Sequence, residues 1–274
     1  MKDEIIKLYL EGKSIRQIEK YVPIKRTRIG FILKEANIPR KSCGNPYKLR
    51  RYNLNQNYFE CIDTNEKAYW LGFIIADGHV SDDGVVITLK ESDREHLSNF
   101  LKCIDSNSNI RYIAKTKSYS ISVYSRDLVK SLRDLGLDAN KSYNAKVPPI
   151  KQKFIKAFLR GLFDGDGSLA VSKNIYKKGK HPTYMVSICG TYSLVNKMVE
   201  TVSKDLNFKN KVKLSQKTDT FFVASWGGNP QVYKILSWLY EDTSYPYLQR
   251  KYDRYITLKI IMDNGGSGYR LSSR

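Results

Sequence analysis

Two stretches of the chain share one pattern of hydrophobic residues, small residues and a terminal Asp-Gly pair. "WLGFIIADG" at 70–78 and "LRGLFDGDG" at 159–167 both have the composition of a buried helix until they end in an acid and a glycine. Their final aspartates, Asp77 and Asp166, are 89 residues apart (166 − 77 = 89). The pattern predicts two equivalent buried helices, each terminated by a glycine just past its last turn.

The segments that follow the two helices also repeat in type and order. Alternating apolar and polar residues predict strands, and apolar residues spaced three and four apart predict helices. The predicted strands cover 84–89, 109–116, 119–125, 183–189, 210–217 and 220–226, and the predicted helices cover 92–104, 126–136, 192–206 and 230–242. With one further short strand in each half, directly after the buried helix and the least marked in the sequence, each half is α-β-β-α-β-β-α, and the fold class is α+β. We predict a pseudo-two-fold pair of halves, 61–150 and 151–263, with antiparallel sheets.

Small residues line one side of each predicted buried helix. Gly72 and Ala76 are four residues apart, and so are Gly161 and Gly165. At 3.6 residues per turn each pair lies on one face and removes nearly all side-chain bulk from it. The two helices are therefore predicted to pack backbone against backbone, which would place their terminal acids side by side.

Paired acids at two helix ends are electrostatically unfavourable on their own. A carboxylate near a helix C-terminus meets the negative end of the dipole, at a cost of about 0.3–1 kcal/mol. Two carboxylates a few Å apart also hinder each other's ionisation. A divalent cation reverses this balance, and hard oxygen ligands suit Mg²⁺. Asp77 and Asp166 are thus predicted metal ligands; the alternative is two unrelated helix ends facing solvent.

Residues 1–42 form a separate pattern of three short helices, in which Ser14 can cap the second. A tight break before the third helix indicates a helix-turn-helix, whose third helix would present Lys25, Arg26 and Arg28 to DNA. The alternative is a generic three-helix cap with a solvated basic edge. Residues 43–60 are predicted to be a basic linker, and 264–274 a flexible tail.

Composition narrows the partners and the compartment. The chain has 47 Lys+Arg against 27 Asp+Glu, a net charge of +20, and an isoelectric point near 9.6. Such a field attracts polyanions, and nucleic acid is the expected partner. Four scattered cysteines without a CxxC pair argue against a zinc site or a disulfide framework. No signal segment or membrane-spanning apolar run is present in the sequence, so we expect a cytoplasmic (prokaryotic or phage-encoded) or organellar protein that is not secreted.

The two stretches resemble two copies of the LAGLIDADG motif, which names a family of homing endonucleases. The first copy departs from the motif at Trp70 and Ile75, whereas the second keeps Asp164. The resemblance runs from about residue 61 to 262 and includes "YLQRKYDRY" at 247–255, which is similar to the closing helix of many members. It implies a saddle-shaped sheet surface lying on DNA and paired acids that cut both strands. It also implies that the carbonyls of Ala76 and Gly165 complete the metal coordination.

Several basic residues are candidates for contact with DNA. In "NKVKLSQK", Lys211, Lys213, Ser215 and Lys217 alternate with Val212, Leu214 and Gln216, which predicts one cationic and one dry face. The further candidates are Arg111, Lys115 and Lys173. Lys90, at the end of a predicted strand, is our candidate for polarising the attacking water; the alternative is a solvated lysine at a strand end.

These patterns together predict a monomeric, Mg²⁺-dependent, site-specific double-strand DNA endonuclease with a long asymmetric target, as in intron homing. The family's single-chain, two-motif type with an added helix-turn-helix fits this chain. Two alternatives stay open at this point. One is a transcription regulator on the same scaffold, against which the retention of both acids speaks; the other is a maturase that binds intron RNA.

Overall fold

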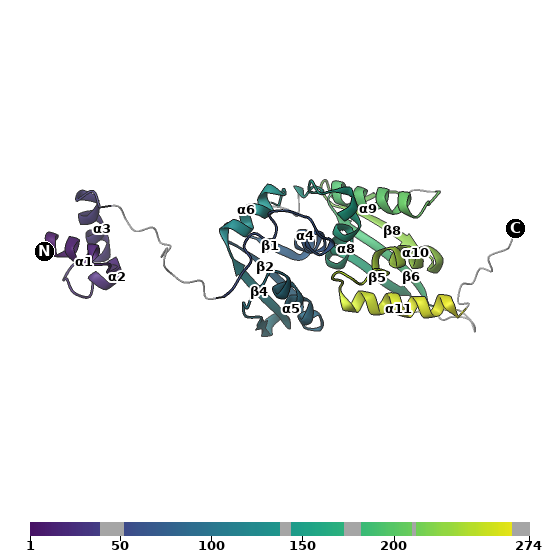
Figure 1. Cartoon of the computed structure of the whole chain (residues 1–274), viewed down its shortest axis with the longest axis horizontal. Helices are drawn as coiled ribbons and strands as arrows, with labels where there is room; N and C mark the ends of the chain where they lie inside the picture. Colours follow the sequence, from purple (N-terminus) through teal and green to yellow (C-terminus); the bar gives the residue numbers. More distant parts are fainter. Residues whose placement is uncertain (39–51, 138–143, 173–181, 210–211, 265–274) are drawn as a thin grey trace. The chain divides into compact units, whose positions relative to one another are not determined.

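The computed structural model describes residues 1–38, 52–137, 144–172, 182–209 and 212–264. The chain divides into two compact units, Met1–Arg51 and Tyr52–Arg274 (Figure 1). Each unit has its own cluster of buried hydrophobic residues. Among the described residues, no helix combines the length and the apolar character needed to cross a bilayer.

The first unit contains the three predicted helices. They are α1 (Lys2–Leu10), α2 (Ile15–Ile18) and α3 (Arg26–Glu35). Ser14 caps α2 as predicted: its side chain accepts a hydrogen bond from the Gln17 backbone, and the Gln17 side chain accepts one from the Ser14 backbone. The core comprises Ile5, Tyr9, Ile18, Val22, Ile29, Ile32 and Leu33. The connection between α2 and α3 spans residues 19–25, which is longer than the tight break that we expected.

The predicted linker at 43–60 is partly wrong. Residues 39–51 lie outside the described part of the chain, but 52–60 pack on the second unit. Tyr58 and Phe59 are buried there, and the Asn55 backbone N–H donates to the Ile104 carbonyl at 2.8 Å. Burial of these two aromatic side chains stabilises the packing of 52–60 on the second unit. The segment is rich in basic residues and asparagine, and this composition led us to predict a linker.

The second unit consists of two four-stranded antiparallel sheets and the helices packed on them. The strand orders are β1-β2-β4-β3 and β5-β6-β8-β7, so the two halves share one topology, which confirms the predicted repeat. The strands are β1 (Gly78–Val80), β2 (Gly84–Lys90), β3 (Arg111–Ile113), β4 (Ser118–Tyr124), β5 (Gly167–Ser172), β6 (Thr183–Gly190), β7 (Ser215–Gln216) and β8 (Phe222–Gly227). The helices are α4 (Asn65–Asp77), α5 (Arg94–Cys103), α6 (Arg126–Asp134), α8 (Ile155–Asp166), α9 (Tyr192–Asp205), α10 (Asn229–Tyr240) and α11 (Gln249–Asp263).

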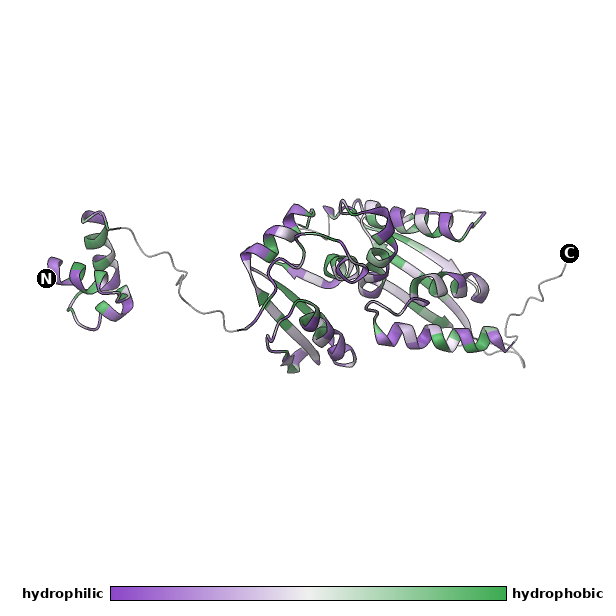
Figure 2. Cartoon of the chain, viewed as in Figure 1, coloured by the Kyte–Doolittle hydropathy of each residue, from purple (hydrophilic) through white to green (hydrophobic). Residues whose placement is uncertain are grey.

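Helices cover one face of each sheet and leave the other face open. α5 and α6 pack on the first sheet, α9 and α10 on the second, and α11 on α10. In Figure 2, α5 and α11 carry both hydrophobic and hydrophilic residues, as expected for helices with one side on the core. The outer face of the first sheet presents hydroxyl side chains: Thr88 donates to Ser120 at 2.9 Å in a cross-strand pair. The first sheet is therefore dry on one side and carries hydroxyl groups on the other.

Two predicted strands are shorter in the structure. The segment predicted as a strand over 109–116 is β3 followed by a 3₁₀ turn, Ala114–Thr116, and that over 210–217 contains only β7. Val212 and Leu214 are partly buried and Lys213 and Ser215 exposed, as predicted, but Gln216 is exposed rather than on the dry face. Both segments are edge strands, which have one hydrogen-bonded neighbour and so less to hold them extended.

The helices α4 and α8 lie side by side between the two sheets (Figure 1). A Cβ atom built on Gly72 would lie 2.1 Å from the Phe158 carbonyl oxygen, and one on Gly161 would lie 1.9 Å from that of Tyr69. No side chain fits at such distances, so the two backbones touch. The predicted packing of the glycine-lined faces is confirmed.

Candidate active site

The contact between α4 and α8 brings their acidic ends together. Asp77 is the last residue of α4 and Asp166 the last of α8. A Cβ on Gly165, the residue before Asp166, would lie 3.4 Å from the carboxyl carbon of Asp77 and 2.3 Å from the Cβ of Ala76. Asp77 is exposed and Asp166 partly exposed, so solvent reaches both carboxylates.

Glycine terminates both helices as predicted, but for a different physical reason. Gly78 and Gly167 have extended backbones (φ −78°, ψ 152° and φ −79°, ψ 149°), not the left-handed conformation of a glycine C-cap. A Cβ on Gly78 would lie 2.8 Å from the Ile74 carbonyl oxygen, and one on Gly167 2.2 Å from the Phe163 ring. Glycine is needed because the chain turns directly from helix into strand against its own last turn.

The donor set at the helix ends fits Mg²⁺ coordinated partly by substrate. In the part of the chain that the structure describes, no three His, Cys, Asp or Glu side chains gather into a metal-binding group. The protein offers two carboxylates, and Ala76 and Gly165, whose carbonyls are the further predicted ligands, directly precede them in the chain. Mg²⁺ is commonly held by one or two carboxylates, with waters and substrate phosphate oxygens completing its octahedron. One backbone oxygen here is already engaged, because the Cys189 thiol donates to the Asp166 carbonyl at 3.2 Å.

A buried lysine lies beneath the paired acids. Lys251, in the first turn of α11, is 1% exposed, and its ammonium group donates to the carbonyls of Phe163, Asp164 and Gly167. These carbonyls belong to the end of α8, where the helix dipole favours a cation. Burial lowers the pKa of Lys251 to about 8, although the negative charges of Asp164, Asp77 and Asp166 oppose the shift. The lysine charge therefore acts on both members of the acid pair.

The sequence contains a signal for Lys251 that our prediction of Lys90 did not use. Leu248, Lys251, Tyr255 and Leu258 recur at helical spacing, and all four are buried. A lysine in such a stripe suffers a desolvation penalty unless it has partners. A charged residue within the apolar face of a helix thus marks Lys251, whereas only its place at a strand end indicates Lys90.

Asp164 is a second buried charge of the same helix end. It is fully buried in α8 and accepts hydrogen bonds from the Tyr69 hydroxyl, the Tyr240 hydroxyl and the Leu248 backbone N–H. Burial raises the pKa of Asp164, while the neighbouring Lys251 and these donors oppose the rise. Three donors and one nearby ammonium group leave this carboxylate well solvated by the protein itself.

Comparison with solved structures shows the fold. The LAGLIDADG meganuclease I-CpaMI bound to uncleaved DNA aligns with a TM-score of 0.51 at 11% identity, over 73% of this chain and 92% of that one. The meganuclease I-SmaMI bound to uncleaveable DNA gives 0.51 at 12%, over 72% and 91%. The LAGLIDADG meganuclease I-AabMI bound to uncleaved DNA gives 0.50 at 13%, over 74% and 92%. This chain has the fold of the LAGLIDADG homing endonucleases.

Sequence comparison adds less. No family model matches the chain. The replication factor C small subunit of Methanocaldococcus jannaschii is 30% identical over 118 residues, 40% of this chain but 6% of that protein. The subunit of the same name from Thermococcus kodakarensis is 32% identical over 111 residues, 39% of this chain and 13% of that one. An uncharacterized protein of M. jannaschii is 29% identical over 171 residues, 58% and 60%. The matching segments thus span only a small part of the two named relatives.

The predicted basic residues of the second unit that the structure describes are all exposed. Lys90 ends β2, opposite Ser118 on β4, on the open face of the first sheet. Arg111 lies on β3 and Lys115 in the turn that follows it, rather than in a continuous strand. Lys213 and Lys217 flank β7 and are exposed. Lys173 and Lys211 lie outside the described residues.

The three candidates in the first unit differ in their partners. Lys25 and Arg28 are exposed at the start of α3. The Arg26 guanidinium instead pairs with Glu19 at 2.9 Å, and the Arg26 backbone N–H donates to the same carboxylate at 3.1 Å. Arg26 therefore closes the connection between α2 and α3, and its charge is partly neutralised within the unit.

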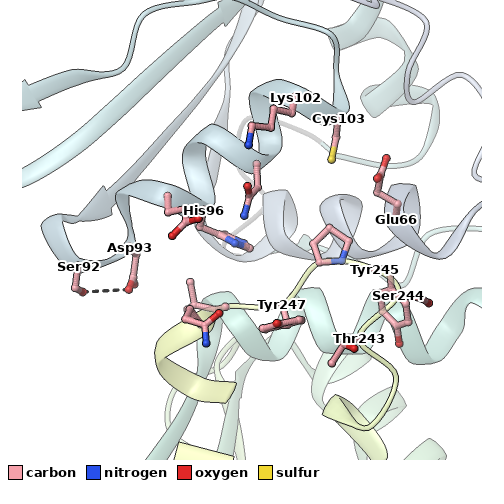
Figure 3. Close-up of a pocket in the computed structure, with 15 residues that line it drawn as sticks. Glu66, Ser92, Asp93, His96, Lys102, Cys103, Thr243, Ser244, Tyr245 and Tyr247 are labelled. Atoms are coloured by element: carbon pink, nitrogen blue, oxygen red, sulfur yellow. Dashed lines mark hydrogen bonds between the residues drawn. The ribbon is translucent and has the colours of Figure 1, made fainter. Parts of the chain in front are cut away.

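A polar pocket of about 530 Å³ lies where α5 meets the segment leading into α11 (Figure 3). His96 on α5 and Tyr247 on that segment line it. Asp93 in its wall accepts a hydrogen bond from Arg250 at 2.7 Å, an ion pair that joins α11 to the first half. Nothing in the lining defines a ligand. The pocket does border His96 and Leu248, which belong to the hydrogen-bond network around Asp164.

Proposed function

We propose that this chain is a Mg²⁺-dependent, site-specific endonuclease that cuts both strands of duplex DNA. The observation that carries the proposal is the backbone contact between α4 and α8, which places Asp77 and Asp166 at one solvent-accessible point. A protein selected for stability alone gains nothing from two carboxylates at adjoining helix C-termini.

The residues of the site divide the work of phosphodiester hydrolysis. Bound between Asp77 and Asp166, Mg²⁺ would lower the pKa of the attacking water and stabilise the leaving oxygen. The two carboxylates would hold the metal ion, which is needed there because carboxylates alone repel the phosphates of the two strands. The Lys251 charge offsets part of the mutual repulsion of Asp77 and Asp166. Lys90 remains our candidate for orienting water, since it is exposed on the open sheet face.

The open faces of the two sheets supply a surface for duplex DNA. They carry hydroxyl side chains and exposed cations, which suit phosphates and base edges alike. The net charge of +20 supports a polyanionic partner. The two halves differ in sequence at these faces, so a bound target would be asymmetric. The first unit, with Lys25 and Arg28 exposed on α3, would extend the contact beyond the cleavage site as a helix-turn-helix.

A cleavage selection tests this function on many candidate targets at once. The protein is incubated with a randomised duplex library in Mg²⁺ or in EDTA, and new ends are sequenced. We expect paired breaks at one enriched asymmetric sequence in Mg²⁺ and none in EDTA. Enrichment by binding without breaks would instead indicate a DNA-binding regulator. Preferential retention of folded RNA over duplex DNA would indicate a maturase.

A further inference from the structure

The start of α11 is held by a side chain from another helix. Its N-cap residue, Leu248, has no side-chain cap, and the Leu248 backbone N–H donates to Oδ2 of Asp164 at 2.7 Å. Lys251 follows within the first turn of the same helix. The position of the Lys251 ammonium group against the end of α8 therefore depends on how firmly this first turn is anchored.

Asp164 is itself fixed by two tyrosines from different elements. Tyr69 of α4 donates to Oδ2 at 2.7 Å, and Tyr240 at the end of α10 donates to Oδ1 at 2.5 Å. All three side chains are fully buried. The single hydroxyl proton of Tyr69 is used on Asp164, so His96 must donate from Nε2 to the Tyr69 oxygen at 2.9 Å. His96 lies at the wall of the pocket in Figure 3.

Only one half of the described repeat has this anchor. Asp164 corresponds to Ile75 in the first motif, at the same offset of 89 residues that relates Asp166 to Asp77 (164 − 75 = 89). Ile75 is buried, and its side chain cannot accept a hydrogen bond. A carboxylate that ties the neighbouring helix to the motif is therefore a feature of the second motif alone.

We propose that Asp164, fixed by Tyr69 and Tyr240, positions Lys251 under the acid pair and thereby makes the two strand cuts unequal in their dependence on this anchor. The inference rests on the proposed nuclease function. The three residues do not touch substrate; they act through Leu248 and the first turn of α11. The three carbonyls that Lys251 binds all flank Asp166, and none flanks Asp77. Loosening that turn therefore moves the lysine charge away from the end of α8 and slows one strand cut more than the other.

Chemical labelling tests the positioning without any cleavage assay. The full chain is treated with formaldehyde and a mild reductant, and methylation of each lysine is followed by mass spectrometry. In Tyr240→Phe and Tyr69→Phe, Lys251 should react about tenfold faster than in the original chain, because a hydrogen bond to a buried carboxylate is lost. The matched control is Tyr58→Phe. Tyr58 is also buried and donates to a carboxylate, Glu66, at 2.7 Å, and its ring lies against Phe59 and Lys67, which are outside α11.

The strand-specific readout uses a duplex recovered from the library selection. The ratio of nicked to fully cut product should rise about tenfold in Tyr240→Phe and in Asp164→Asn, as a displaced group near the reacting centre predicts, and stay unchanged in Tyr58→Phe. Lys251 labelling equal to that of the control overturns the inference, whether or not the chain cuts DNA. If the original chain cuts the duplex and the variants give the same ratio of nicked to fully cut product, the anchor has no role in cleavage. An original chain that cuts nothing refutes the nuclease proposal instead.

Discussion

At the scale of single residues, the unusual feature of this chain is charge placed inside apolar helix faces. Arg160, Asp164 and Lys251 are at most 1% exposed, and each has polar partners at an end of a helix. Arg160 donates to the carbonyls of Leu239 and Asp242, just where α10 ends. Buried charges of this kind are costly unless fully paired, so their pairing fixes how the surrounding segments meet.

Lys251→Met should abolish efficient cleavage while sparing DNA binding. The change removes the ammonium donor from three carbonyls, those of Phe163, Asp164 and Gly167, and removes the cation that offsets the Asp77–Asp166 repulsion. We expect the rate of cleavage to fall by at least about 10²-fold, the usual cost of removing one preorganised electrostatic partner. Single-turnover cleavage and gel-shift titration measure the two effects. Lys259→Met, an exposed lysine on the same helix, should cut normally; equal losses in both variants would contradict the assigned role.

His96 gives the second unit a predicted acid sensitivity. Burial lowers the pKa of His96 to about 3, below the value of about 6.5 expected in the unfolded chain. As pH falls below 6.5, His96 becomes protonated in the unfolded chain but stays neutral in the folded chain. The free energy of unfolding should therefore fall by about 1.4 kcal/mol per pH unit between pH 6.5 and 5 from this group, with no contribution above 6.5.

The variant His96→Gln keeps a donor for Tyr69 and should lack this slope. Urea unfolding followed by tryptophan fluorescence isolates the second unit, because Trp70, Trp226 and Trp238 all lie in it. Variant and original chain should have diverging pH profiles below pH 6.5. Parallel profiles would show that His96 is protonated in the folded protein.

At the scale of elements, the glycine-lined contact of α4 and α8 decides where the acids lie. Gly72→Ala would force a methyl group to within 2.1 Å of the Phe158 carbonyl oxygen, a backbone atom that cannot move aside. We expect a loss of about 3 kcal/mol in the free energy of unfolding, the upper end for overpacked cores. Chemical denaturation measures it. Gly227→Ala, whose added methyl group meets nothing within 4 Å, is the control, and a similar small change in both would disprove the tight contact.

The same elements show what sequence reasoning reached and where it stopped. Local periodicity predicted the buried helices, the sheet strands and the repeat, because each follows from residues close together in the chain. The glycine faces also predicted the contact between helices 89 residues apart, since small residues at i and i+4 of a buried helix favour the close approach of a second backbone. Asp164 and Lys251 could not be paired this way: their relation depends on α11 returning to the end of α8. Tyr58 and Phe59 were missed for a similar reason, being two aromatic residues without a periodic pattern.

At the scale of the whole molecule, the chain combines a compact helical unit with a second unit that has the LAGLIDADG endonuclease fold. Each unit buries its own hydrophobic cluster, so removal of one should leave the other folded. Deleting residues 1–51 should keep cleavage but weaken binding, shorten the nuclease-protection footprint and flatten the dependence of affinity on salt, because phosphate contacts are lost. An unchanged footprint and salt slope would make the first unit a structural cap.

The central claim is that Asp77 and Asp166 act as one site. The most direct measurement is Mg²⁺-dependent double-strand cleavage of a selected duplex by Asp77→Asn and Asp166→Asn, alongside their affinity for that duplex in Ca²⁺. Both variants should bind the duplex with little change and produce no double-strand breaks. Full double-strand cleavage by either variant would contradict the paired-acid site.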